Sequence, residues 1–90
     1  MFVSSINTNI MKLKKDLAIS DSGFLFNPST GDSYSLNPIG VEFFKLLQKG
    51  NSDDEIISQI INDYAIDKNS VEKDLYDFKN LLVNYKLINA

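Results

Sequence analysis

The 90-residue sequence contains no cysteine, no histidine and no tryptophan. The absence of cysteine excludes disulfides, thiol catalysis and thiolate metal sites, and it is consistent with a reducing compartment. Without histidine or cysteine, the usual pairs of nucleophile and base and most transition-metal sites are excluded as well. We therefore expect a cytoplasmic protein that is not an enzyme and that uses neither a metal nor another cofactor.

Long apolar runs and arginine are also missing. No run approaches the roughly 20 apolar residues that a membrane-spanning helix needs, and the N-terminal apolar stretch is too short for a signal peptide. The net charge is −3, whereas a surface that binds phosphates is normally basic. We expect neither membrane nor nucleic acid as a partner. Residues 1–12 are predicted to be a flexible N-terminal tail, and residues 13–90 a single small domain.

Three short segments with alternating side chains open the predicted domain, at residues 16–20, 24–26 and 32–36. They are separated by the turn sequences DSG and NPSTG, in which glycine and proline supply the required backbone angles. This spacing predicts a three-stranded antiparallel meander. The residues expected on its core face are Leu17, Ile19, Phe24, Phe26, Tyr34 and Leu36.

Three helices are predicted after the sheet. Asn37 caps the first, with Pro38 at its first position, and the second begins with the capping box Ser52–Glu55. The third runs from about Ser70 to about Tyr85. Strands followed by helices indicate an α+β fold around one core. The expected core residues are Ile39, Phe43, Phe44, Leu46 and Leu47, then Ile56, Ile57, Ile60, Ile61 and Tyr64, then Val71, Leu75, Phe78, Leu82 and Tyr85.

The stretches LNPIGVEFFKLLQKGNSDDEI and SVEKDLYDFKNLLVNYKLI resemble the PqqD family, which belongs to the wider class of RiPP recognition elements. The resemblance covers about Leu17 to Ile88 and departs at Lys86, where the family usually has glycine. Its matching residues are Leu36–Asn37, Leu46–Leu47 before Gly50, Asp74 with Leu75, Phe78 and Leu82, and Leu87–Ile88.

This resemblance implies a winged-helix-like domain, with a three-stranded antiparallel sheet followed by three helices. It also implies a non-catalytic adaptor for natural product biosynthesis. Such domains capture the leader of a ribosomally synthesised precursor peptide and present it to a modifying enzyme, often a radical SAM enzyme, as in PQQ biosynthesis. In the family, the leader lies between the third strand and the third helix.

The third strand also favours peptide binding on physical grounds. Exposed strand edges are usually blunted by lysine, proline or a bulge, but residues 32–36 contain no lysine, proline or internal glycine. An extended peptide can add to such an edge as a further strand. Tyr34 is consistent with either a core position or a position in the binding groove. The candidate peptide-binding residues of this strand are Asp32, Ser33, Tyr34, Ser35 and Leu36.

The third helix has two flanks beside its core stripe, and either is a candidate second wall. One carries Asp74, Asp77 and Leu81, and the other carries Glu72, Tyr76, Lys79 and Val83. We prefer the first, because Asp74 matches the family pattern, although Asp74 is equally suited to stabilising the start of the helix. The candidate residues of this helix are Asp74, Leu75, Asp77, Phe78 and Leu81.

Two other functions remain open from the sequence. A winged helix can bind DNA, but the lysines of the third helix alternate with acidic residues, which does not suit phosphate contact. The open strand edge can alternatively pair with a second copy of itself, which would make the chain a structural dimerisation module and a homodimer.

Overall fold

The computed structural model describes residues 12–89, so the tail predicted for residues 1–12 lies outside the described residues except for Lys12. Three strands form an antiparallel sheet in the order β2-β3-β4, and three helices follow it, which confirms the predicted α+β fold. The strands are β2 (Ala18–Ile19), β3 (Phe24–Asn27) and β4 (Asp32–Ser35), and the helices are α2 (Pro38–Gln48), α3 (Asp53–Tyr64) and α4 (Lys68–Asn84).

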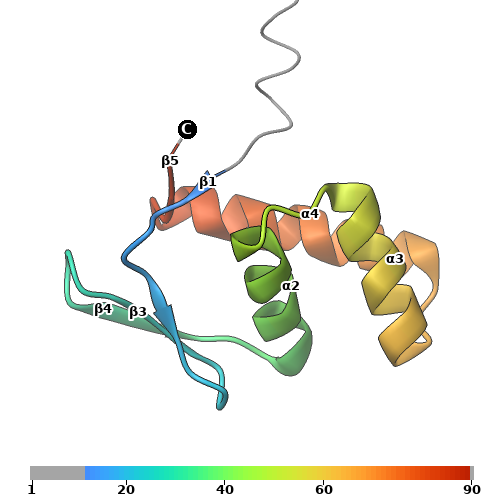
Figure 1. Ribbon diagram of the computed structural model, residues 1–90, viewed down its shortest axis with the longest axis horizontal. Coiled ribbons are helices and arrows are strands. Elements are labelled where there is room, and N and C mark those ends of the chain that lie inside the picture. The colour runs from blue at the N-terminus through green and yellow to red at the C-terminus, as the bar shows by residue number, and fades with distance from the viewer. Residues whose placement is uncertain (1–11, 90) are drawn as a thin grey trace, which may run out of the picture.

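A second, two-stranded sheet was not predicted. β1 (Lys12–Leu13) pairs antiparallel with β5 (Ile88–Asn89), so the two ends of the described chain lie side by side. Leu87 directly precedes this pair, and its side chain is fully buried. Figure 1 shows the pair beside the C-terminal end of α4, with the β3–β4 hairpin at the same end of the molecule and α3 at the other.

The core lies between the helices and one face of the sheet. Leu17, Ile19, Tyr34 and Leu36 belong to the core or pack against it as predicted, but β3 turns the opposite face from the predicted one towards it. Leu25 is fully buried, whereas Phe24 and Phe26 are 55% and 43% exposed. The prediction that both phenylalanines belong to the core is therefore wrong. A strand that reads Phe-Leu-Phe is apolar on both faces, so alternation alone does not say which face is inside. Asn27 is buried on the same side as Leu25, and its Oδ1 accepts the Ser29 backbone N–H at 3.0 Å.

The helix starts follow the predicted capping chemistry, with one shift. Asn37 caps α2 and Ser52 caps α3, where the capping box with Glu55 is complete. α4 begins at Lys68 rather than near Ser70, because Asp67 accepts the Ser70 backbone N–H at 3.1 Å. Hydrogen bonds from Ser70 lower the pKa of the Asp67 carboxyl, as expected for an N-cap that acts in its charged form.

The predicted core stripes of the helices are confirmed except at their ends. Phe43, Phe44 and Phe78 are buried, but Tyr64 and Tyr85 are 40% and 46% exposed. Both tyrosines were predicted to be core residues and are not. Tyr64 is the last residue of α3 and Tyr85 is the C-cap residue that follows α4, so both lie at helix ends.

The end of α4 shows why glycine suits position 86, where the sequence departs from the family pattern. Leu87 N donates to Leu82 O at 2.9 Å and Lys86 N donates to Val83 O at 3.0 Å, which is the hydrogen-bond pattern of a Schellman motif. The motif requires a left-handed residue, and Lys86 has φ of +58°. Glycine adopts this conformation without the steric cost that a Cβ brings. With Lys86 the turn still forms, but the left-handed conformation of this residue brings a steric cost.

Gly23 holds the end of β4 in place. Its φ is +98°, and a Cβ at this position would lie 2.6 Å from the Leu36 carbonyl oxygen. The Leu36 backbone N–H in turn donates to the Gly23 carbonyl at 2.7 Å. Only glycine allows this close approach, so the turn residue between β2 and β3 also fixes where β4 leaves the sheet.

None of the helices described between residues 12 and 89 is long and apolar enough to cross a membrane.

We predict that Lys86→Gly stabilises the protein by about 1 kcal/mol, because glycine removes the steric cost of the left-handed residue. Urea denaturation measures the free energy of unfolding. Lys73→Gly is the matched control, since it makes the same substitution at an exposed position inside α4. The control is expected to lose about 0.5–1 kcal/mol. A loss of stability in both variants would show that residue 86 gains nothing from glycine.

Candidate functional site

β4 is an edge strand of the three-stranded sheet. Among residues 12–89, its only neighbour is β3, with Leu25 opposite Tyr34 and Phe26 opposite Ser33. The Leu36 backbone N–H points into the sheet, because it donates to the Gly23 carbonyl at 2.7 Å. The N–H and C=O groups of successive residues point to alternate edges of an antiparallel strand, so those of Tyr34 also point inward, to β3. The N–H and C=O groups of Ser33 and Ser35 therefore point outward, along the free edge.

The other edge of the sheet offers less to an incoming strand. β2 contains only Ala18 and Ile19, and the Ser20 N–H is already bonded to Phe24 O at 2.9 Å. By the same alternation, Ile19 alone within β2 directs its backbone groups away from β3. β4 thus presents two residues for strand pairing where β2 presents one.

The C-terminal half of α4 packs beside the inner face of β4. The ring centroids of Tyr34 and Tyr85 are 4.4 Å apart. At the other end of the strand, Leu36 and Phe78 both lie close to Gly40. A Cβ on Gly40 would be 3.4 Å from Leu36 Cβ and 3.7 Å from Phe78 Cε1. The strand and the helix therefore run in opposite directions, with residue 34 beside residue 85 and residue 36 towards residue 78.

Tyr34 connects β4 to the end of α4, and its surroundings change the pKa of its hydroxyl. Its side chain is half-buried and packs against the core, as the core interpretation predicts, and a position in the binding groove stays a prediction. Desolvation raises the pKa of the Tyr34 hydroxyl, and the nearby Asp32 carboxylate and Tyr85 raise it further. The hydroxyl therefore stays protonated and remains a hydrogen-bond donor.

The two flanks of α4 have different surroundings. At 100° per residue, Tyr85 falls in the same sector as Asp74, Asp77 and Leu81, so this flank faces β4. The opposite flank faces α3, where Lys79 Nζ lies 2.8 Å from Asp53 Oδ2. An open hollow between α3 and α4 is lined by Asp53, Asp54, Ile57, Glu72, Leu75, Tyr76, Lys79 and Asn80. The preferred flank is therefore the one that the fold places beside the strand.

The structure brings together most, not all, of the candidate peptide-binding residues. Ser33, Tyr34, Ser35 and Leu36 lie along β4 or its end, and Leu81 is half-buried on the facing side of α4. Phe78 is 8% exposed, and its ring lies near Gly40, on the side where Leu36 is found. Leu75 is 2% exposed and lines the hollow against α3 instead. Tyr85, which the helical spacing assigned to the core, also lies beside β4, because its ring contacts that of Tyr34.

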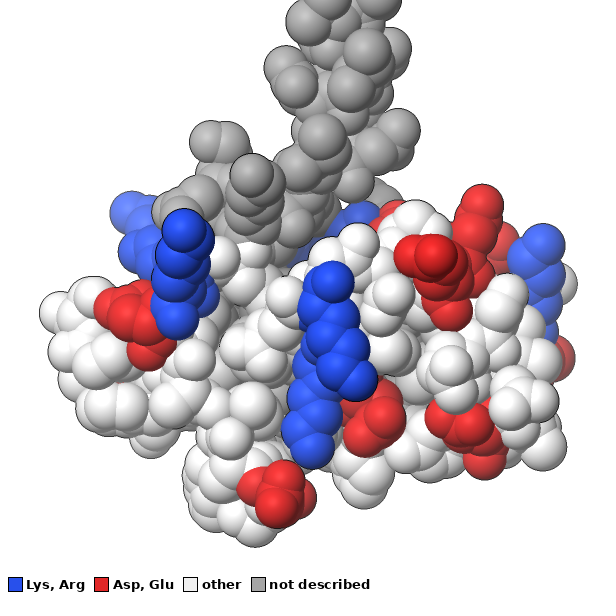
Figure 2. Space-filling view, viewed as in Figure 1, with Lys and Arg blue, Asp and Glu red and all other residues white. Residues whose placement is uncertain are grey.

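The charged candidates mark the two ends of this region. Asp32 begins β4, and Asp74 and Asp77 lie one to two turns before Leu81. All three are exposed, and neither ion pair found within residues 12–89 includes them. Figure 2 shows acidic and basic side chains interspersed on the face in view, without a continuous basic surface. No group of three potential metal-ligating side chains occurs in the described part of the chain.

Two solved structures are similar to this chain. A search of the curated proteins finds no match. Among solved structures, TbiB1 in complex with the TbiA(beta) leader peptide is 31% identical, with a TM-score of 0.78 over 89% of this chain and 96% of that chain. A lasso peptide synthetase B1 complexed with the leader peptide shares the fold at 17% identity, with a TM-score of 0.78 over 90% of this chain and 99% of that one.

The family comparison covers most of the chain. The model of the family described as coenzyme PQQ synthesis protein D matches residues 23–88. This range includes β3, β4, all three helices and the start of β5. The chain belongs to the PqqD family.

Proposed function

We propose that this chain is a non-catalytic adaptor that binds the leader of a ribosomally synthesised precursor peptide as an added strand on β4. The observation that carries the proposal is the outward direction of the Ser33 and Ser35 backbone groups on an edge strand without lysine or proline. It is supported by family membership and by the similar TbiB1, which was solved with a leader peptide.

Strand addition defines how the guest would sit. Four backbone groups, two each on Ser33 and Ser35, are available for hydrogen bonds to the guest. The guest residue opposite Tyr34 would then point its side chain inward, towards Tyr85 and Leu81. The carboxylates of Asp74 and Asp77 lie beyond the Leu36 end and suit a basic or amide-bearing guest residue.

Backbone pairing alone is too weak to account for specific binding. Each hydrogen bond contributes about 1 kcal/mol net, so four contribute about 4 kcal/mol. A dissociation constant of 1 µM corresponds to about 8 kcal/mol, after the cost of association has been met. Buried guest side chains must supply most of the affinity, and the apolar face of α4 beside β4 is where they can be buried.

Binding without catalysis implies a second protein. The guest is held along the edge of a small domain, and the modified part of the precursor would extend beyond it to a modifying enzyme. The family resemblance points to a radical SAM enzyme as one such partner, and the composition suits a cytoplasmic setting. Pairing of β4 with a second copy would use the same edge and would compete with the guest.

A DNA-binding role is not favoured by the surface. α4 would be the reader helix of a winged-helix protein, but its Lys79 is paired with Asp53 at 2.8 Å. Its flank beside β4 is acidic rather than basic, which opposes phosphate contact.

We predict that Ser35→Pro weakens leader binding at least tenfold, because proline removes one outward N–H without breaking the inward pairing with β3. Ser35→Ala keeps the N–H and should bind within about twofold of wild type. The measurement is fluorescence anisotropy with labelled peptides selected from a random 12-residue display library, with the TbiA(beta) leader as a comparison. Equal affinity of the proline and alanine variants would contradict strand addition at β4.

Leu81→Ala and Val83→Ala test which flank of α4 contacts the guest peptide, because each variant removes an aliphatic side chain from a different flank. Leu81→Ala is expected to weaken binding of the same peptides about tenfold, because it removes apolar surface beside β4. Val83→Ala, at a position 49% exposed on the other flank, should leave affinity unchanged. Thermal unfolding of both variants controls for stability. The reverse ranking would place the guest on the flank that faces α3.

A further inference from the structure

The outer face of the sheet carries two exposed phenylalanines that the core does not use. Phe24 lies opposite Ser35 and Phe26 lies opposite both Ser33 and Ala18, so these side chains share one face. Phe24 and Phe26 are 55% and 43% exposed. None of the five residues is charged, although 23% of the chain is. An aromatic pair on an uncharged sheet face indicates a contact surface.

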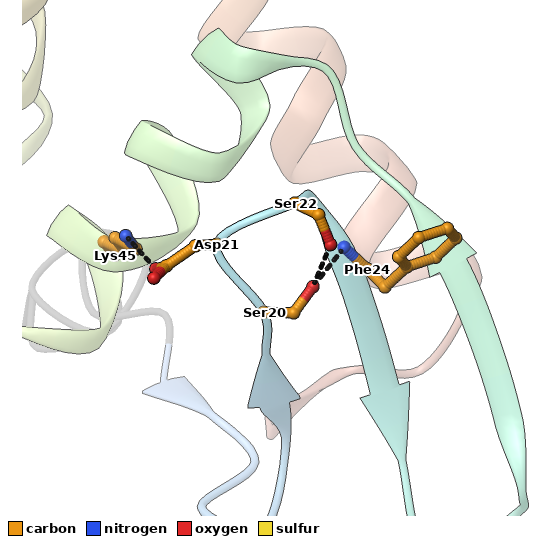
Figure 3. A network of polar contacts seen from close by, with 5 residues as sticks. All are labelled: Ser20, Asp21, Ser22, Phe24 and Lys45. Atoms are coloured by element: carbon orange, nitrogen blue, oxygen red, sulfur yellow. Dashed lines mark hydrogen bonds and ion pairs between the residues drawn. The ribbon is translucent and has the colours of Figure 1, made fainter.

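The position of Phe24 is fixed by its surroundings. The Phe24 backbone N–H donates to Ser20 Oγ at 3.0 Å, and Ser20 Oγ lies 3.0 Å from Ser22 Oγ. Asp21 in the same turn faces Lys45 of α2, with 3.5 Å between Oδ1 and Nζ. Figure 3 shows this network and the Phe24 ring, which extends from β3 over β4, away from Lys45. The ring therefore leans towards the open edge.

The register places this face next to the proposed guest. Side chains of a fourth strand alternate between the two faces, and those opposite Ser33 and Ser35 would lie on the outer face. Strands are about 4.8 Å apart, so such a side chain would lie about 9.6 Å from the β3 backbone. Serine side chains are small, so a large guest side chain and a phenylalanine ring can meet above them.

We propose that Phe24 and Phe26 recognise the leader on the outer face of the sheet, by contact with large apolar side chains opposite Ser35 and Ser33. This inference rests on the proposed function and defines its substrate class. The leader would present apolar residues on both faces of its bound segment, inward to α4 and outward to the phenylalanine pair. Its recognition sequence would be a short continuous apolar run rather than a strictly alternating one.

The alternative occupant, a second copy packed face to face, has too little surface here. Three strands of at most four residues cover about 10 Å by 14 Å, or about 140 Å² of footprint. A stable interface buries about 800 Å² on each partner. A guest strand needs less, because its backbone already pairs with β4 and the phenylalanines only add to that contact.

The test is a random 12-residue peptide display selection on three proteins: wild type, the double variant F24S/F26S, and Tyr76→Ser. Tyr76 is 67% exposed on the flank of α4 that faces away from β4, so its variant controls for the loss of an exposed aromatic. Wild type and the control should enrich large apolar residues at both inward and outward positions. The double variant should keep the inward preference, lose the outward one, and bind the wild-type peptides about tenfold more weakly.

The outcomes separate this inference from the proposed function. If peptides are selected that depend on the Ser35 N–H but show the same outward residues on wild type and on the double variant, the role of the phenylalanines is wrong and the adaptor function stands. If no selected peptide depends on the Ser35 N–H, the proposed function fails. Sedimentation velocity completes the test: a wild-type dimer that F24S/F26S abolishes would assign this face to a second copy and overturn the inference.

Discussion

The proposed function depends on the outward backbone groups of Ser33 and Ser35, for which residues 12–89 supply no partner strand. Water can satisfy these groups, and so can an extended peptide, which forms the same hydrogen bonds and adds side-chain contacts. The rest of the fold determines which peptides gain from that exchange. It supplies the acidic and apolar flank of α4 on one side of the edge and two phenylalanines on the other.

Several local features hold β4 in this position. Gly23 allows its turn to approach the Leu36 carbonyl, and Gly40 leaves room for Leu36 and Phe78, which both lie within 4 Å of where its Cβ would be. The Tyr34 ring packs at a tilt against the Tyr85 ring at the other end of the strand. Tyr85 is placed by the turn that ends α4, where Lys86 adopts a left-handed conformation. The strand is thus attached to the helices at both ends, while no other strand among residues 12–89 pairs with its outer edge.

The sequence was sufficient to predict the order of the three-stranded sheet and the three helices, because that order follows from turn and capping residues, but not the β1–β5 pair. DSG and NPSTG separate the strands, and Asn37 and Ser52 begin α2 and α3 as expected. The ladder register and the edge position of β4 follow from these short turns. The start of α4 was misplaced by two residues, because Asp67 as well as Ser70 is a favourable capping residue.

The sequence was insufficient where two faces are chemically alike. Phe24, Leu25 and Phe26 are all apolar, so only packing decides that leucine is inside and the phenylalanines are outside. Tyr85 continues the helical stripe of Leu82 and Phe78, yet the helix ends before it and its ring turns to Tyr34. Both errors concern residues beside β4, where aromatic side chains are exposed at the proposed binding edge instead of filling the core.

Amide hydrogen exchange along β4 tests the central claim most directly. In the free protein, the amides of Ser33 and Ser35 should exchange rapidly, and that of Tyr34 slowly, because only Tyr34 pairs with β3. A bound leader peptide should slow exchange at Ser33 and Ser35 and leave Tyr34 nearly unchanged. Saturating peptide that leaves Ser33 and Ser35 exchanging as in the free protein would contradict strand addition at this edge.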